Sequence, residues 1–147
     1  MPGIVRDSTL TKESEYVGSG VWNDPTTSAS ITTAGAVTYT AAQILSGIVK
    51  RDPNGASRTD VLPTAALIVA AMAAKMGSAK VGDMFDFLVI NEADAAETIT
   101  HTLGAGMTSG VVAGTQVSAA IAQNATRRYV VRLTNVTGGA EACVIYA

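Results

Sequence analysis

The stretch DMFDFLVIN, residues 83–91, decides the class of fold. Successive side chains of a β-strand point to opposite faces of its sheet. One face of this stretch carries Phe85, Phe87 and Val89, and the other carries Met84, Leu88 and Ile90. Because both faces are largely apolar, the stretch predicts a central strand of its sheet.

Strand patterns recur on both sides of this segment. Residues 43–51 are rich in β-branched side chains and end at the turn Asp52-Pro53-Asn54-Gly55, after which residues 57–61 are expected to return as a hairpin. Residues 98–103 alternate like a strand with one wet face, and residues 103–114 predict a glycine-rich loop or loose hairpin. Further strands are expected at residues 115–123, 127–136 and 141–146. Short strands about ten residues apart, with one helix, predict an all-β domain of β-sandwich or jelly-roll-like form.

The helix is expected near residues 63–76, where the sequence is rich in alanine. Pro63 suits the first turn of a helix, Lys75 complements the negative end of the helix dipole, and Gly77 is a natural stop. Nearly every face of this segment is apolar. That distribution predicts a helix covered on several sides.

The first 35 residues differ from the rest because their apolar residues are too scattered for a sustained period. We expect residues 1–35 to form an N-terminal arm and residues 36–147 to form the β-sandwich domain. The arm contains Tyr16, Val21 and the only tryptophan, Trp22, which are our candidate contacts with a partner protein. The alternative is that residues 15–22 form a first strand of the domain.

The composition limits the classes of partner. Only 15% of the residues are charged and 5% are aromatic, so the core is built from small side chains and a second burial surface between copies would help. A net charge of -2 provides no attraction to nucleic acid or to an anionic membrane. The most apolar segment, residues 65–74, is about half the ~20 residues that span a bilayer. The first twenty residues lack the apolar run of a secretory signal, so we expect the chain to start in a cytoplasm.

Single residues that often perform chemistry have ordinary interpretations here. His101 is the only histidine, and no second histidine or cysteine lies at metal-ligand spacing, so we interpret it as an ordinary strand residue. Cys143, the only cysteine, lies in an apolar strand pattern that predicts a buried, unreactive thiol. The glycines Gly104, Gly106 and Gly110 lack the Lys-Ser/Thr of a phosphate loop and are interpreted as flexible.

Charged clusters also have ordinary interpretations. The turn at residues 52–55 begins like a calcium loop, but no glutamate closes it at the motif spacing, so we prefer a simple turn. The acids around the central strand are interpreted as solvated carboxylates rather than a glycosidase pair; they are Asp83, Asp86, Glu92, Asp94 and Glu97. Arg127, Arg128 and Arg132 are expected to form salt bridges between subunits. We therefore expect no catalytic residue, no cofactor and no metal.

Three stretches together resemble the small β-sandwich domains of tailed-bacteriophage capsid decoration (cement) proteins. They are SGIVKRDPNGASRTDVLPTAALIVAAM (46–72), VGDMFDFLVIN (81–91) and RRYVVRLTNVTGGAEACVIY (127–146). The resemblance extends over residues 42–146. It implies a non-enzymatic virion structural protein, typically a homotrimer, that binds the outer surface of the major capsid protein shell and stabilises it after assembly in the host cytoplasm.

Two other functions also fit the sequence. A trimeric tail-fibre or receptor-binding domain of a phage would use the same sandwich. A cytoplasmic enzyme with a shallow site is the other class, and its sign would be a buried polar cluster around His101.

Overall fold

The computed structural model describes residues 21–22, 28–110 and 117–147. The strands are β1 (Val21–Trp22), β2 (Ala29–Ile31), β3 (Ile48–Arg51), β4 (Arg58–Val61), β5 (Met84–Asn91), β6 (Ile99–Thr102), β7 (Met107–Ser109), β8 (Thr126–Asn135) and β9 (Ala142–Tyr146). The helices are α2 (Ala41–Leu45) and α3 (Ala65–Met76). The predicted mainly-β class is confirmed.

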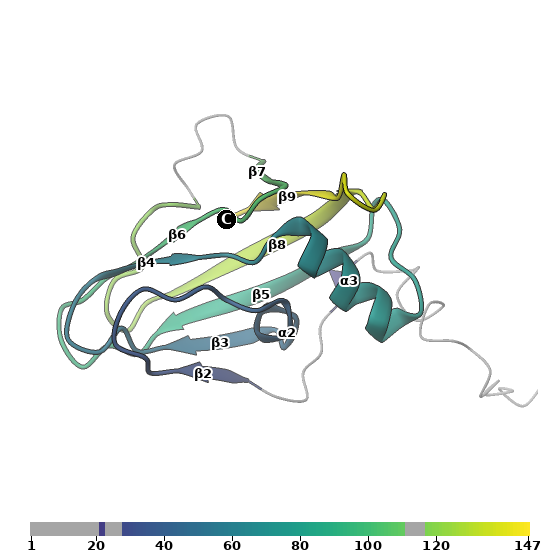
Figure 1. Ribbon diagram of the computed structural model, residues 1–147. Helices are drawn as coiled ribbons and strands as arrows, with labels where there is room; N and C mark the ends of the chain where they lie inside the picture. The colour runs from purple at the N-terminus through teal and green to yellow at the C-terminus, as the bar shows by residue number, and fades with distance from the viewer. Residues whose placement is uncertain (1–20, 23–27, 111–116) are drawn as a thin grey trace, which may run out of the picture.

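The strands form two sheets (Figure 1). The larger is a seven-stranded mixed sheet with the order β2-β3-β5-β8-β9-β7, and β1 also pairs with β5. The smaller sheet consists of β4 and β6 in parallel. The two helices and the small sheet lie over one face of the large sheet and enclose the core between them (Figure 1).

The central position predicted for residues 83–91 is confirmed, because β5 pairs in parallel with β3 and antiparallel with β8. Phe85, Phe87 and Val89 point into the core and are at most 1% exposed. Only one face of β5 is covered by helices and the small sheet in the described part of the chain. Met84 and Leu88 on the opposite face are only partly buried, because both helices and the small sheet lie on the core side.

The predicted helix is confirmed as α3. The Thr64 hydroxyl caps its first turn by accepting a hydrogen bond from the Leu67 backbone N–H, and Gly77 ends it with a left-handed φ of 84°. The expectation that the helix is covered on several sides is wrong, because only the face that carries Ile68 and Met72 meets the core, and Leu67 is 55% exposed. Among the described residues, no helix is both long and apolar enough to cross a membrane.

The strand expected from residue 43 is wrong at its start. Thr40 and Gln43 form a reciprocal capping box, so residues 41–45 are helical and β3 begins only at Ile48. The predicted turn is present, with Asn54 and Gly55 at positive φ of 52° and 89°. The predicted hairpin is wrong, because β3 pairs in parallel with β2 and β5 whereas β4 pairs with β6.

Part of the expected arm belongs to the large sheet. In β1, Val21 pairs with Met84 of β5 and Trp22 with Phe85, and β2 pairs with β3. The sheet therefore begins before residue 36. Residues 1–20, which include Tyr16, and residues 23–27 lie outside the described residues.

The strand expected at residues 115–123 is absent from its described part, residues 117–123. Ile121 forms only an isolated bridge with Ile99 of β6. The Asn91 side-chain amide donates a hydrogen bond to the Ile121 carbonyl. Asn124 turns the chain with a positive φ of 59° immediately before β8. In the described residues, pairing of this segment with β6 is limited to that one bridge.

Candidate functional site

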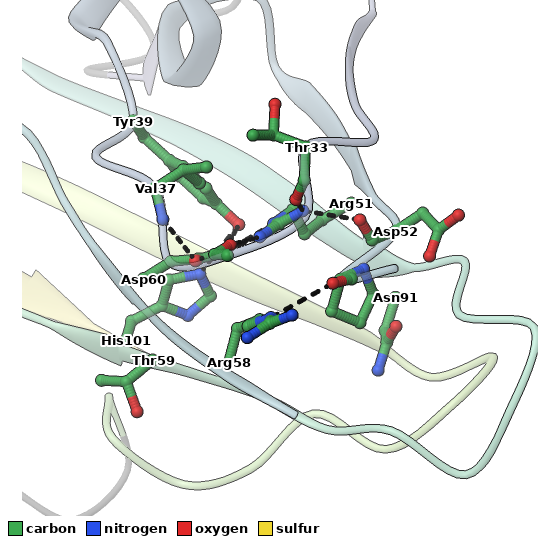
Figure 2. Close-up of polar contacts among 12 residues, drawn as sticks. Thr33, Val37, Tyr39, Arg51, Asp52, Arg58, Thr59, Asp60, Asn91 and His101 are labelled. Carbon is green, nitrogen blue, oxygen red and sulfur yellow. Dashed lines mark hydrogen bonds and ion pairs between the residues drawn. The ribbon is translucent and has the colours of Figure 1, made fainter. Parts of the chain in front are cut away.

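His101 lies at the centre of a buried polar cluster between the two sheets (Figure 2). It is on β6, paired in register with Asp60 of β4, and both side chains point towards the large sheet. Its ring makes edge-on contacts with the rings of Tyr39 and Tyr129, at centroid distances of 5.2 and 5.4 Å. The cluster therefore joins β4, β6, β8 and the segment before α2.

The hydrogen bonds of the cluster have a fixed direction. The Tyr39 hydroxyl donates to Oδ2 of the Asp60 carboxylate at 3.3 Å, so its oxygen accepts from His101 Nε2–H at 3.2 Å. In a neutral imidazole the other nitrogen is then an acceptor, and His101 Nδ1 accepts from the Tyr129 hydroxyl at 2.8 Å. The cluster is thus a relay of single hydrogen bonds from Tyr129 through His101 and Tyr39 to Asp60. The nearby Arg127 guanidinium lowers the pKa of Tyr129, against the larger effect of burial.

The acid end of the relay is held by Arg51. Arg51 Nε donates to Asp60 Oδ2 at 2.8 Å and Nη2 donates to Oδ1 at 3.4 Å. The remaining guanidinium contacts are with the backbone carbonyl oxygens of Thr33 (2.9 Å), Gly35 (2.6 Å) and Asp52 (2.5 Å). Asp60 Oδ1 also accepts from the backbone N–H of Val37 at 2.9 Å. Both charged groups therefore have their hydrogen-bonding needs met inside the protein.

Burial sets the protonation states of the cluster. Desolvation lowers the pKa of His101 to about 4, a fall that the nearby Asp60 carboxylate only partly opposes, so the imidazole is neutral at pH 7. Desolvation, with the Asp60 charge as a further cause, raises the pKa of Tyr39 far above its ordinary value, and burial raises the pKa of Tyr129 to about 12. Both tyrosines keep their protons and act as donors.

The cluster is sealed from solvent. Arg51, Asp60 and Tyr129 are 0% exposed, and Tyr39 and His101 are 1% exposed. A general base must come within hydrogen-bond reach of the proton that it abstracts, and a substrate cannot approach these atoms in this structure. The arrangement instead cross-links the layers. His101 is thus more than an ordinary strand residue. The alternation of Ile99, His101 and Leu103 in the sequence indicates that its side chain points to the interior.

The five acids around the central strand do not gather at one site. Asp86 binds Arg128 of β8 at 2.7 Å, Glu92 binds Lys50 at 3.1 Å, and Asp83 accepts from the Lys80 backbone N–H in a turn. The ion pair of Arg128 with Asp86 joins two strands of the same chain, whereas a salt bridge between subunits is the expectation for Arg128. Asp94 and Glu97 lie elsewhere, beside Asp52, and these three side chains bring one carboxylate oxygen each to within 4.8 Å of the others.

The face of the large sheet opposite the core, here called the open face, is apolar at its centre. Ile48 of β3 lies directly beside Leu88 of β5, and Ile90 and Val130 flank them on the same face. Ile48 is 38% exposed and the other three are partly buried. Charged and polar side chains surround this centre; they are Lys50, Asp86, Thr126, Arg128 and Arg132. An apolar centre within a polar rim is the usual anatomy of a protein–protein interface.

The glycines and the cysteine have structural roles. The interpretation of Gly104 as flexible is wrong, because it is buried and a Cβ there would lie 2.4 Å from the Pro63 carbonyl oxygen. Gly110 packs against the ring of Tyr146 in the same way. The prediction for Cys143 is confirmed, since the thiol is 0% exposed and burial raises its pKa to about 11.

Comparison with protein-family models, with curated protein sequences and with solved structures finds no match to this chain. The function is therefore inferred from the sequence and from the geometry described above.

Proposed function

We propose that the protein is a non-enzymatic virion structural protein that decorates the outer surface of a major capsid protein shell and stabilises it. The observation that carries this proposal is the open face. Its apolar centre, formed around Ile48 and Leu88, has no described element over it, and protein surfaces of this kind are typical docking sites. The choice of a capsid as partner rests on the resemblance of residues 42–146 to capsid decoration proteins.

A buried polar cluster around His101, the sign given above for an enzyme, is present, but it is sealed from solvent, so no substrate reaches its atoms and a non-enzymatic role is favoured. The only histidine of the chain is used to bridge two tyrosines and is 1% exposed. In the proposed architecture the small sheet and α3 are the second layer of a sandwich-like domain, and this cluster fastens that layer to the large sheet. A rigid domain with one open face suits a clamp between capsid subunits.

We further propose that the protein acts as a homotrimer and that Tyr16, Val21 and Trp22 contribute to partner contacts. The low charged fraction, 15%, supports association with other protein surfaces. Val21 and Trp22 lie in β1, which pairs with the start of β5, and Met84 at this position belongs to the open face. The β1 segment of Val21 and Trp22 is therefore next to the end of β5 that carries Met84.

The test uses the double variant Ile48→Lys/Leu88→Lys, with Leu67→Lys as a matched control on the exposed side of α3. Burial of each apolar side chain contributes roughly 1.5 to 3 kcal/mol, so the double variant should bind capsids at least roughly tenfold more weakly. Co-sedimentation with capsids that lack the protein measures attachment, light scattering measures the trimer mass, and circular dichroism verifies the fold.

The outcomes distinguish the parts of the proposal. Weaker capsid binding by a folded double variant, with normal binding by Leu67→Lys, supports docking through the open face. If the double variant binds capsids normally and has the normal mass, the open face is not the docking surface, and the proposal loses its structural basis. Failure of the unmodified protein to bind capsids at all contradicts the decoration role itself.

A further inference from the structure

Three carboxylates converge at one end of the large sheet. Asp52 directly follows β3, and Asp94 and Glu97 lie in the loop that follows β5. Because β3 and β5 are parallel and Arg51 pairs in register with Asn91, the two loops leave the sheet side by side. One carboxylate oxygen from each acid lies within 4.8 Å of the other two.

These acids have no cationic partner among the residues that the structure describes. The basic residues nearby have other partners, since Lys50 binds Glu92, Arg51 binds Asp60, and Arg58 Nε donates to the Pro53 carbonyl at 3.2 Å. Like charges at this separation repel one another. A group of this kind is stable at neutral pH when a cation lies among the oxygens.

Glu97 provides an independent observation. Its side chain is only 7% exposed, and its Oε2 atom is buried without any hydrogen-bond donor. Buried carboxylate oxygens in folded proteins are nearly always paired with a donor or coordinate a metal. The unpartnered oxygen belongs to the same residue that completes the group of three, so it points to a ligand at this place.

The two loops are held by contacts that do not occupy the Glu97 carboxylate. Asn91, which is 0% exposed, donates from Nδ2 to the Glu97 carbonyl at 2.9 Å, and its Oδ1 accepts from the Ala93 N–H at 3.0 Å. In the other loop, Oδ1 of Asp52 accepts from the Asn54 N–H at 2.9 Å. The backbone of both loops is thus held in place before any ion binds, which lowers the entropy cost of binding.

We propose that Asp52, Asp94 and Glu97 bind a calcium ion. The donors are all hard oxygens, which suit Ca²⁺ and Mg²⁺ rather than Zn²⁺. Ca²⁺ accepts six to eight oxygen ligands in a flexible geometry, whereas Mg²⁺ demands a near-ideal octahedron and gives up its water reluctantly, so three carboxylates from two loops suit Ca²⁺ better. Asp94 is exposed and Asp52 is half-buried, so water can fill the remaining coordination positions.

This site explains the calcium-like start of the turn at residues 52–55. The sequence motif requires a glutamate further along the same loop, and none is present there. The fold instead brings Glu97 from the loop after β5. A bound ion would therefore tie the turn after β3 to the loop after β5.

The experiment uses the full chain and two measurements. Isothermal titration with CaCl₂ after treatment with EDTA should give one saturable site, and millimolar Ca²⁺ should raise the melting temperature by several degrees more than Mg²⁺ does. Glu97→Gln and Asp94→Asn should each weaken Ca²⁺ binding at least roughly tenfold. Glu92→Gln is the matched control, because Glu92 lies on the same loop but binds Lys50.

Glu97→Gln should also melt no lower than the unmodified protein when EDTA is present, because it removes an unpaired buried charge. If Glu97→Gln does not fold, the Ca²⁺ affinity of Asp94→Asn, a change at an exposed residue, tests the proposal. The proposal is overturned if Ca²⁺ gives no saturable heat, if Mg²⁺ binds equally well, or if the control loses as much affinity as the two ligand variants. None of these results depends on capsid binding.

Discussion

Arg51 and Asp60 form an ion pair at 2.8 Å in which neither side chain has exposed area. The pair joins β3 of the large sheet to β4 of the small sheet. Because both ions are removed from water, the stability of this pair depends on the further hydrogen bonds from Val37 and Tyr39 and on the backbone carbonyls around the guanidinium.

Replacement of Arg51 should be strongly destabilising. Arg51→Met leaves the Asp60 carboxylate buried without its counterion, and loss of one partner of a buried pair costs about 3–5 kcal/mol. Lys50→Met is the control, because it breaks an ion pair with Glu92 in which both side chains are 42% exposed, and such pairs contribute about 1 kcal/mol or less. Denaturation by urea measures the free energy of unfolding of both variants. Equal losses of stability would show that the buried pair has no special role.

The stability should fall as the pH falls from about 6.5 to about 4. His101 is neutral in the fold with a pKa of about 4, whereas the unfolded chain takes up a proton near its ordinary pKa of 6.5. Protons therefore favour the unfolded state in this window, by at most about 3 kcal/mol at its acid end. Thermal melts of the protein and of His101→Gln should differ in slope between pH 6.5 and 5, where carboxylates contribute little.

The single histidine makes a direct check of this prediction simple. Only the Cε1–H and Cδ2–H resonances of one imidazole should be visible by NMR, and neither should titrate above pH 5 while the protein is folded. A folded-state midpoint near pH 6.5 would mean that His101 is not desolvated as described.

Gly104→Ala should destabilise the domain by about 1–3 kcal/mol. The added Cβ would meet the carbonyl oxygens of Leu62 and Pro63 at 2.5 and 2.4 Å, and backbone atoms cannot easily move away. Gly138→Ala is the matched control, because a Cβ at Gly138 has nothing within 4 Å. Equal melting temperatures for the two variants would show that the segment before β7 can shift freely.

Cys143 should not react with Ellman's reagent in the native protein. Burial raises the pKa of the thiol to about 11, so little thiolate exists at pH 8, and the side chain is 0% exposed. In guanidinium chloride the same thiol should react at once. Rapid reaction without denaturant would reveal local opening of β9.

The sequence predicted the elements whose pattern is local. The alternation in β5, β6, β8 and β9 and the helix boundaries around Thr64 and Gly77 depend on neighbouring residues, and these elements appeared close to where they were expected. The pairing of strands did not follow from such patterns. Parallel partners such as β3 and β5 are chosen by tertiary packing, so the predicted hairpin after β3 was wrong.

The candidate sites were hidden for a related reason. Nothing near His101 in the sequence indicates that Tyr39 and Tyr129 become its partners, because they come from segments far away along the chain. Asp52, Asp94 and Glu97 were each recognised as acids at turns, but only the parallel register of β3 and β5 brings them together. The short helix α2 was missed because the capping box of Thr40 and Gln43 precedes a run of β-branched residues.

The parallel pairing described for β1, β2 and β3 affects how quickly the chain reaches its native state. Each of these pairs must close a loop of chain before its hydrogen bonds form, so the contact order is high and folding is expected to take roughly milliseconds to seconds. During that interval both apolar sides of β5 are open to other chains. Low temperature and low protein concentration during refolding should therefore raise the yield of monodisperse protein.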